Sequence, residues 1–217
     1  MIKKICAAGL AVMLMSSAAM AADKDNLPSE VNADAIEYDM NTGVVAAEGN
    51  VLLKHGTTKA TGLHALYNVN TQEAHLIGNV IVVDEDMRIT CGALMSNGQG
   101  HMIADENVIA TQTVAPGEKY PDGDVRTFRG EHIDFFPDDR KHVIIPNGGI
   151  AKSDVEGTFT ADNLEGWIDD ERYIGSGNAH LISETLKLEG AGEKCDYKGN
   201  QRGEGFLRGD SWTPTDI

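Results

Sequence analysis

The residues in this chain that could do chemistry are its histidines and its clustered carboxylates. The seven histidines are scattered singly, without an H-E-x-x-H motif or a cysteine pair at zinc-binding spacing. The acids gather at Asp138-Asp139 and at Asp169-Asp170-Glu171, and paired carboxylates are the residues that cleave glycosidic bonds. Both groups occupy equivalent polar turns of a repeat described below, so a repeated turn accounts for them without catalysis. We therefore expect no catalytic residue, no metal site and no cofactor.

The cysteines raise the question of a disulfide bond. Cys6 lies in a leader segment, which leaves Cys91 and Cys195 in the rest of the chain. Export from the cytoplasm favours a disulfide between these two thiols, because disulfides form and persist in oxidising compartments. Their separation in the repeat pattern disfavours it, because a disulfide needs Cα atoms within about 7 Å. The sequence leaves the Cys91–Cys195 bond open.

The N-terminus has the pattern of a secretory signal peptide. Lys3 and Lys4 precede an apolar run, residues 5–15, and the small-residue site Ala19-Met20-Ala21 follows. The run is shorter than the roughly 20 residues that span a bilayer. We predict that residues 1–21 are cleaved after Ala21 and that residues 22–217 form a soluble protein exported across the inner membrane.

The net charge excludes one class of partner. The chain carries a formal charge of −16, and loss of the leader with its two lysines takes this to −18. Binding to nucleic acid depends on Lys and Arg that neutralise phosphates, so nucleic acid is not expected as a partner. A high net charge instead favours solubility.

The chain repeats itself. The most similar copies close on Gly49-Asn50-Val51 and Gly78-Asn79-Val80, 29 residues apart. The copies span residues 31–51 (a partial one), 59–80, 88–108, 126–150, 158–179 and 187–209. The successive end points after residue 51 are residues 80, 108, 150 and 179, with intervals of 29, 28, 42 and 29. Similarity at a near-constant period indicates stacked units that bury their apolar faces against one another.

Each copy has two arms around a polar turn, and the arms alternate with a period of two. In one arm Leu76, Val80 and Val82 share one side while Ile77 and Val83 share the other. This pattern is typical of half-buried strands. We predict an all-β protein of about 12 to 14 strands, with a surface loop inserted at residues 113–125, which are rich in Pro, Gly and Asp.

The repeated pattern resembles a known family. Ala33-Asp34 and Tyr38 before Gly49-Asn50-Val51, and Tyr67 before Gly78-Asn79-Val80, are similar to the OstA-like (organic solvent tolerance-like) domain over residues 31–200. Glu106-Asn107-Val108 and the last copy depart from it. The resemblance implies a single domain over residues 22–217. Its fold would be a twisted antiparallel β-jelly roll, a stacked repeat of V-shaped strand layers with an open apolar groove.

The resemblance also implies a function, because the family includes the periplasmic bridge of lipopolysaccharide transport. A protein of this kind would lie in the periplasm of a Gram-negative cell and shield the acyl chains of lipid A between the inner and outer membranes. Its partners would be lipopolysaccharide, the inner- and outer-membrane transport components with related folds, and further copies of itself, head to tail. It would not be an enzyme.

Physical reasoning from the charge agrees with binding through acyl chains. Lipopolysaccharide and this chain are both anionic, so affinity must come from buried methylenes, which contribute about 0.8 kcal/mol each. The alternating pattern places the following residues in the groove as lipid-binding candidates: Val51, Leu53, Leu76, Val80, Val82, Val108, Phe135, Ile144, Ile150 and Leu181.

Two other readings of the repeat stay open. A β-solenoid enzyme that acts on polysaccharides would use the carboxylate turns along an external cleft. A purely structural envelope protein would use the repeats only to build a rod.

Overall fold

The computed structural model describes residues 3–5, 12–13, 29–183, 185, 188–199, 205–208 and 213–215. It divides into two compact units, residues 1–99 (unit 1) and residues 100–217 (unit 2). The predicted cleavage site after Ala21 lies outside the described residues. A single domain over residues 22–217 stays a prediction.

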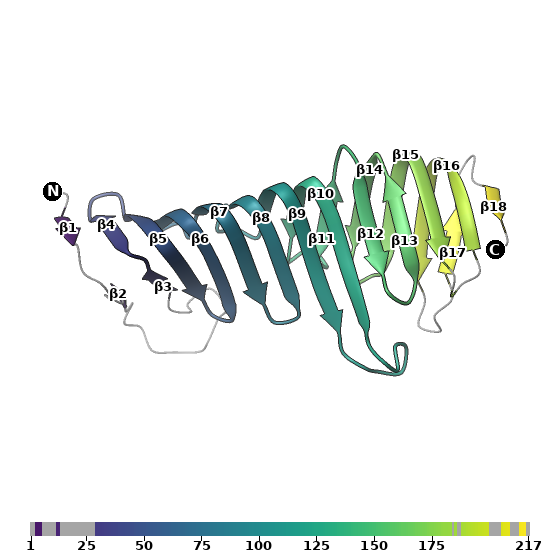
Figure 1. Ribbon diagram of the computed structural model, residues 1–217, viewed down its shortest axis with the longest axis horizontal. Helices are drawn as coiled ribbons and strands as arrows, with labels where there is room; N and C mark the ends of the chain where they lie inside the picture. The colour runs from purple at the N-terminus through teal and green to yellow at the C-terminus, as the bar shows by residue number, and fades with distance from the viewer. Residues whose placement is uncertain are drawn as a thin grey trace. The chain divides into compact units, whose positions relative to one another are not determined.

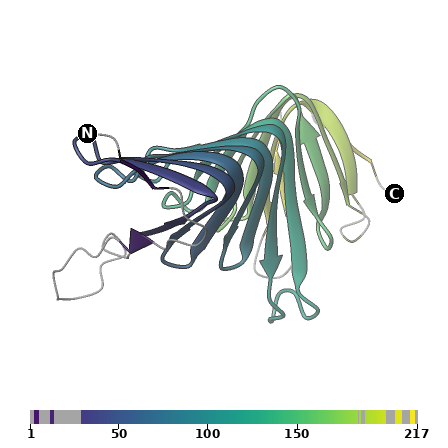
Figure 2. The same ribbon diagram turned by 60° about the vertical axis from the view of Figure 1, so that its left-hand side comes forward.

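Unit 1 is built on four long neighbouring strands, which lie side by side from dark blue to teal in Figures 1 and 2. They are β5 (Val44–His55), β6 (Thr58–Asn68), β7 (Ala74–Asp84) and β8 (Met87–Ser96). The shorter strands β3 (Ser29–Asn32) and β4 (Ala35–Asp39) pair with the two halves of β5. In the leader, β1 (Lys3–Ile5) pairs with β4, and β2 (Val12–Met13) pairs with β3.

Unit 2 is built of four long strands and three interrupted ones among its described residues. The long strands are β9 (Met102–Val114), β10 (Asp124–Phe136), β15 (Arg172–Ser183) and β16 (Leu188–Gly199). The interrupted ones are β11 (His142–Ile145) with β12 (Gly149–Ser153), β13 (Gly157–Ala161) with β14 (Asn163–Trp167), and β17 (Gly205–Arg208) with β18 (Thr213–Thr215).

The predicted fold class is confirmed. Every pairing among the described strands is antiparallel. The described residues contain no helix, and hence none long and apolar enough to cross a membrane. The described strands number 18, more than the predicted 12 to 14. Several of them are halves of one long strand that is interrupted where the sheet bends.

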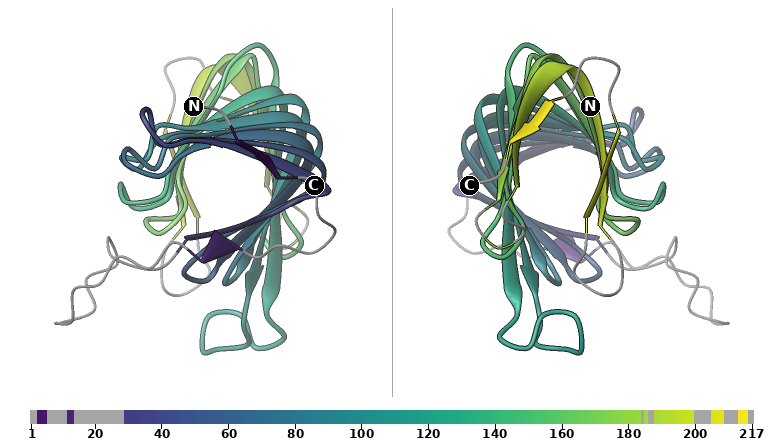
Figure 3. Two further views of the ribbon diagram at one scale, coloured as in Figure 1. Left: turned by 90° about the vertical axis from the view of Figure 1, so that its left-hand side faces the viewer. Right: turned by 90° about the vertical axis from the view of Figure 1, so that its right-hand side faces the viewer.

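The bend is made by two consecutive residues with positive φ. Gly49 and Asn50 have φ values of 72° and 45°, and Gly78 and Asn79 have values of 85° and 50°. The pairing register of β5 with β6 breaks at this point, between Glu48 and Val51. An extra unpaired segment of this kind is a β-bulge, which bends a strand sharply. The Gly-Asn-Val triplet is therefore the corner at which these two copies fold into two arms. Figure 3 shows the bent strands.

An aspartate in the break between two neighbouring short strands holds the corner in two copies. Asp34 donates its N–H to the carbonyl of Gly49 at 2.8 Å, and its carboxylate accepts a hydrogen bond from the Asn50 amide at 2.9 Å. Asp162 makes the same two bonds, with Gly177 at 2.8 Å and with Asn178 at 2.8 Å. The corners thus satisfy their polar groups locally, which is what a bend in a sheet requires.

We predict that a side chain at Gly177 destabilises unit 2. Its φ is 73°, and an added Cβ would lie 2.6 Å from the Asp162 carboxylate. Gly177→Ala should lower the free energy of unfolding by about 1–2 kcal/mol, measured by denaturant titration. Gly117→Ala is the matched control, because its Cβ would meet nothing closer than the Ala115 carbonyl oxygen at 4.0 Å. Equal losses in the two variants would contradict the role of the corner.

Candidate functional site

The inner face of unit 1 is apolar on both sides of its corners. Val45 and Ala47 precede the first corner and Val51 follows it, and these side chains are 1–4% exposed. Leu76 and Val80 flank the second corner and are each 1% exposed. The two corner residues keep the alternation of side chains in phase. Residues with the same odd or even numbering therefore point inward before and after a corner.

In unit 2 the inner faces of the two arms contact each other. We call the arm containing residues 124–130, β12 and β13 the β12 arm, and the arm containing residues 132–136, β11 and β14 the β11 arm. The ring of Phe128 on the β12 arm lies 6.0 Å from that of Tyr173, which extends the β11 arm. Both side chains are below a tenth exposed. The arms therefore enclose an apolar interior.

Most of the predicted groove residues point into these interiors. The following seven are buried, with exposures of 1–7%: Val51, Leu76, Val80, Val82, Val108, Phe135 and Leu181. Leu53 is half-buried. Whether any of them contacts a lipid stays a prediction.

Two predicted inward orientations are wrong. Ile150 is 39% exposed, and Ile144 is half-buried while its neighbours Val143 and Ile145 are 1% and 0% exposed. The corner of this copy is Asn147-Gly148, with φ values of 60° and 103°, rather than Gly148-Gly149. The buried Gly149 thus takes the place of Val51, which turns Ile150 outward. A one-residue shift in alignment reverses every side chain of a strand.

The interior of unit 2 holds a small cavity of about 30 Å³. One water needs about 10–15 Å³ on this measure, so the cavity has room for a water molecule or two and none for an acyl chain. Its lining combines apolar groups, among them Phe128, Phe159 and Leu181, with the charged side chains of Arg126 and Glu156. The lining is thus partly apolar and partly charged, and the space that it encloses is narrow.

A cluster of charged and phenolic side chains joins the tips of the two arms. We call it the clasp, made of Lys119, Tyr120, Arg126, Glu156 and Glu171. Arg126 Nη2 donates to Glu171 Oε1 at 2.7 Å, and Lys119 Nζ pairs with Glu171 Oε2 and, at 3.1 Å, with Glu156 Oε1. Tyr120 donates its hydroxyl to Glu156 Oε1 at 2.5 Å and accepts from Arg126 Nη2 at 3.0 Å.

The clasp connects segments that are far apart in sequence. Glu171 ends the turn at the tip of the β11 arm, and Arg126 lies near the tip of the β12 arm. Glu156 lies in the turn between β12 and β13. Lys119 and Tyr120 belong to the loop between β9 and β10. The clasp therefore closes the mouth of the unit 2 interior.

Burial and ion pairing set the charge state of the clasp. Burial by itself would raise the pKa of the Glu171 carboxyl, but hydrogen bonds from Lys119 and Arg126 outweigh it and hold the pKa below its ordinary value. Burial, together with the hydrogen bond to Glu156, raises the pKa of the Tyr120 hydroxyl. At neutral pH Glu171 is thus an anion, and Tyr120 is a neutral donor.

The inserted loop predicted at residues 113–125 is present but is not simply a surface loop. It spans residues 115–123 between β9 and β10, and Tyr120 within it is 5% exposed. The sequence held one signal for this arrangement. Asp124 and Arg126 share the inward parity of Phe128, and charged side chains on a buried face require partners.

The histidines of unit 2 lie beside carboxylates on the outer face. His132 Nδ1 lies 2.7 Å from an Asp105 oxygen, and this hydrogen bond is the main reason that the pKa of His132 is raised. Within the described residues no group of three His, Cys, Asp or Glu side chains is arranged to hold a metal. The turn acids Asp139 and Asp170 both pair with Arg140.

Four rings form a ladder across this outer face. His101 stacks on Phe136 at 4.4 Å, Phe136 lies 5.5 Å from His142, and His142 stacks on Trp167 at 4.6 Å. Arg172 follows at 5.6 Å from the Trp167 ring. The ladder crosses β10, β11 and β14 and reaches β15, so it ties neighbouring strands of the β11 arm together.

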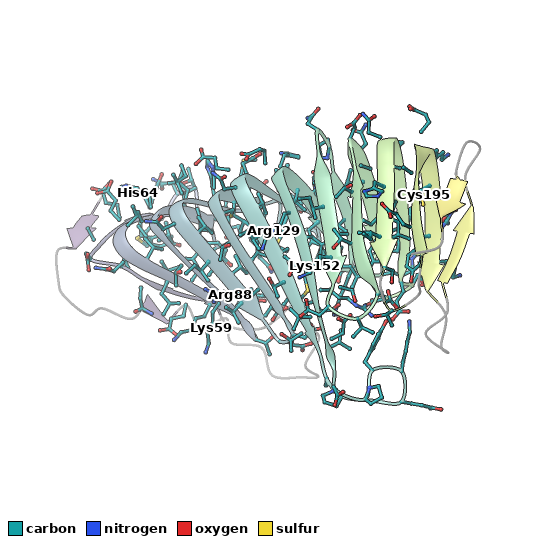
Figure 4. The ribbon with its side chains drawn as sticks, turned by 45° about the vertical axis from the view of Figure 1, so that its right-hand side comes forward. Lys59, His64, Arg88, Arg129, Lys152 and Cys195 are labelled. Carbon is teal, nitrogen blue, oxygen red and sulfur yellow. The ribbon has the colours of Figure 1, made fainter. Side chains whose placement is uncertain are left out.

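Cys91 and Cys195 are not joined to each other by a disulfide bond. Cys91 on β8 is 8% exposed, and Cys195 on β16 is fully buried (Figure 4 labels Cys195). Burial raises the pKa of the Cys195 thiol to about 12. The disulfide that the sequence left open is not formed, and each thiol instead fills part of the interior of its own unit.

In structural terms the chain is an all-β protein of bent antiparallel layers with apolar inner faces. No protein-family model matches it, and no curated protein matches it in sequence. Among solved structures it is similar to the crystal structure of LptH from Pseudomonas aeruginosa, described as the LptA-homologous periplasmic component of the lipopolysaccharide transport device. The identity is 17%, the match covers 89% of this chain and 98% of that chain, and the TM-score is 0.25.

We predict that acid removes the stabilisation that the clasp provides. Because the pKa of Glu171 is lowered in the folded state, its contribution is present above the unfolded pKa, near 4.5, and is lost as the pH falls through the folded pKa. At neutral pH, Glu171→Gln should lower the free energy of unfolding by about 2 kcal/mol. The difference from wild type should shrink below about pH 4.

The measurement is denaturant unfolding of both proteins across this pH range. Asp170→Asn removes the neighbouring carboxylate, whose side chain is 39% exposed, and it should have little effect. A constant difference between wild type and Glu171→Gln down to the acid end would contradict the assignment.

Proposed function

We propose that this protein is a periplasmic bridge that binds lipopolysaccharide and shields the acyl chains of lipid A on their way from the inner to the outer membrane. One observation carries the proposal. In both units the inner-face residues next to the described corners are apolar, with Leu76, Val80 and Val108 each 1% exposed. Such a lining favours hydrocarbon, and each methylene that it buries contributes about 0.8 kcal/mol.

The charge of the chain is compatible with this ligand. Repulsion between a chain of charge −16 and an anionic headgroup is screened beyond about 8–10 Å at physiological salt. Shelter of several acyl chains therefore outweighs it, and the headgroup stays near the arm tips. The pattern that resembles the OstA-like family supports the same ligand.

The interior of unit 2 is too narrow for an acyl chain, so its two arms have to separate when an acyl chain enters. The corners are the natural hinges, because only two residues in each copy set the angle between the arms. A purely structural rod is the second candidate, and the 30 Å³ cavity is the observation that favours it. Trapping of ligand from within the interior distinguishes the two.

We predict that interior positions capture lipid and exterior ones do not. A photo-crosslinking phenylalanine analogue fits best at Tyr67 and Phe135, which are inward aromatic residues 9% and 7% exposed. The matched exterior positions are Leu66, 51% exposed, and Val125, 37% exposed. Irradiation in cells should give lipopolysaccharide adducts only at the first pair. Folded variants that capture no lipid at either interior position would support the rod.

Self-association would follow from the ends of the strand stack. In the full chain the leader strands β1 and β2 pair with β4 and β3, so removal of the leader leaves this edge without those partners. An open edge presents unpaired N–H and C=O groups that accept another strand. Contacts with the membrane components of the transport device would use the same kind of edge pairing.

We predict head-to-tail association of the mature chain, residues 22–217, that depends on concentration. Sedimentation velocity should show a rising weight-average mass as concentration increases. The Asp34 N–H bonds to Gly49, and successive N–H groups of a strand alternate in direction, so the N–H of Glu37, at the centre of β4, points away from β5. Glu37→Pro removes this edge donor and should lower the association. A mature chain that stays monomeric at high concentration would contradict this proposal.

A further inference from the structure

Two cationic side chains and a phenolic hydroxyl surround one carboxylate in the clasp. Glu171 lies 2.7 Å from Arg126 Nη2 and 3.1 Å from the Tyr120 hydroxyl, and its second oxygen pairs with Lys119. We propose that Lys119, Tyr120 and Arg126 form a binding site for the phosphate group of an acylated lipid, which Glu171 occupies when no lipid is bound. This inference rests on the proposed function and deepens it.

The donors are held in place independently of Glu171. Arg126 is 5% exposed, and its Nε donates to Asp124 at 3.2 Å. Asp124 is itself fixed by the Ser153 hydroxyl at 2.8 Å. Tyr120 is 5% exposed and hydrogen-bonds to Glu156. A guanidinium and an ammonium held in this way suit a phosphate, which accepts several charge-assisted hydrogen bonds at once.

The surroundings select an amphiphilic ligand rather than a free anion. Arg126 borders the same cavity as Phe128, Phe159 and Leu181. A ligand with an anionic group and a hydrocarbon chain satisfies both parts, because the chain would enter between the arms while the phosphate stays at their tips. Inorganic phosphate satisfies only the donors.

Separation of the two arms would both open the interior and free the donors from Glu171. Glu171 belongs to the β11 arm, whereas Arg126 is on the β12 arm and Lys119 and Tyr120 are on the loop that precedes it. Separation of the arms withdraws Glu171 from all three donors and widens the cavity beside them. An incoming phosphate then takes the place of the Glu171 carboxylate, while Asp124 stays paired with Arg126 and Glu156 with Lys119.

The outer face of the same arm offers matched controls. Arg129 lies three residues from Arg126 on β10 but is exposed, and it is labelled in Figure 4. Asp170 neighbours Glu171 but pairs with Arg140. Removal of these charges changes the net charge equally without touching the clasp.

The experiment compares the binding of three probes to the mature chain: lipid A with its phosphates, the same lipid A after enzymatic dephosphorylation, and inorganic phosphate. The proteins are wild type, Glu171→Gln, Lys119→Gln and Arg126→Gln, with Asp170→Asn and Arg129→Gln as controls. Lipid binding is read by displacement of a fluorescent acyl probe, and phosphate binding by calorimetry. Circular dichroism confirms folding, and Lys119→Gln keeps the test valid if Arg126→Gln does not fold.

We expect Glu171→Gln to bind phosphorylated lipid A about three- to tenfold more tightly, because a competing charged acceptor is lost. Lys119→Gln and Arg126→Gln should bind it more weakly by a similar factor. Dephosphorylated lipid A should not respond to any of these changes, and the controls should resemble wild type. Equal affinity of folded wild type and Glu171→Gln for phosphorylated lipid A, or equal changes for both lipids, would overturn the phosphate site.

The outcomes separate this inference from the proposed function. If both lipids bind but Glu171→Gln does not alter the preference between them, the bridge function stands and the phosphate site fails. If neither lipid binds while Glu171→Gln gains affinity for inorganic phosphate, the donors form an anion site and the bridge function fails. If no probe binds, both fail.

Discussion

The structure depends on a two-residue corner in which both residues adopt positive φ. Such a conformation costs about 1 kcal/mol or more for a residue with a side chain. Glycine and asparagine tolerate it best, and they occupy four of the five corners found among the described residues. Glu106-Asn107 is the exception, with φ values of 69° and 53°. Because each corner keeps the side-chain alternation in phase, one apolar face continues along both arms.

The sequence predicted this architecture well, because the corner and the alternation are both local signals. Gly49-Asn50-Val51 and Gly78-Asn79-Val80 marked the bends, and period-two alternation placed Leu76 and Val80 inward. The error at Ile150 came from the fourth corner, where Asn147-Gly148-Gly149 offers two glycines and the wrong one was aligned. A turn with two candidate residues for positive φ has no unique register in sequence alone.

The clasp could not be predicted in this way, because it depends on contacts between distant segments. In the sequence, Glu171 is one more acid in a polar turn, and Lys119 and Tyr120 are part of the predicted surface loop. Only the fold brings these residues to Arg126. The two units therefore differ in the polarity of one inner face, that of the arm made by the residues that follow each corner. Inward positions such as Val82 and Ile89 keep that arm apolar in unit 1, whereas Arg126 and Asp124 make it charged in unit 2.

The stacked rings on the outside of the β11 arm have a mechanical consequence. His101, Phe136, His142 and Trp167 run perpendicular to the strands, so shearing one strand against the next would separate rings that now lie 4.4–5.5 Å apart. The β11 arm therefore resists sliding of its strands past one another. Opening and closing motions of unit 2 are therefore concentrated at its corners, where the angle between the two arms changes.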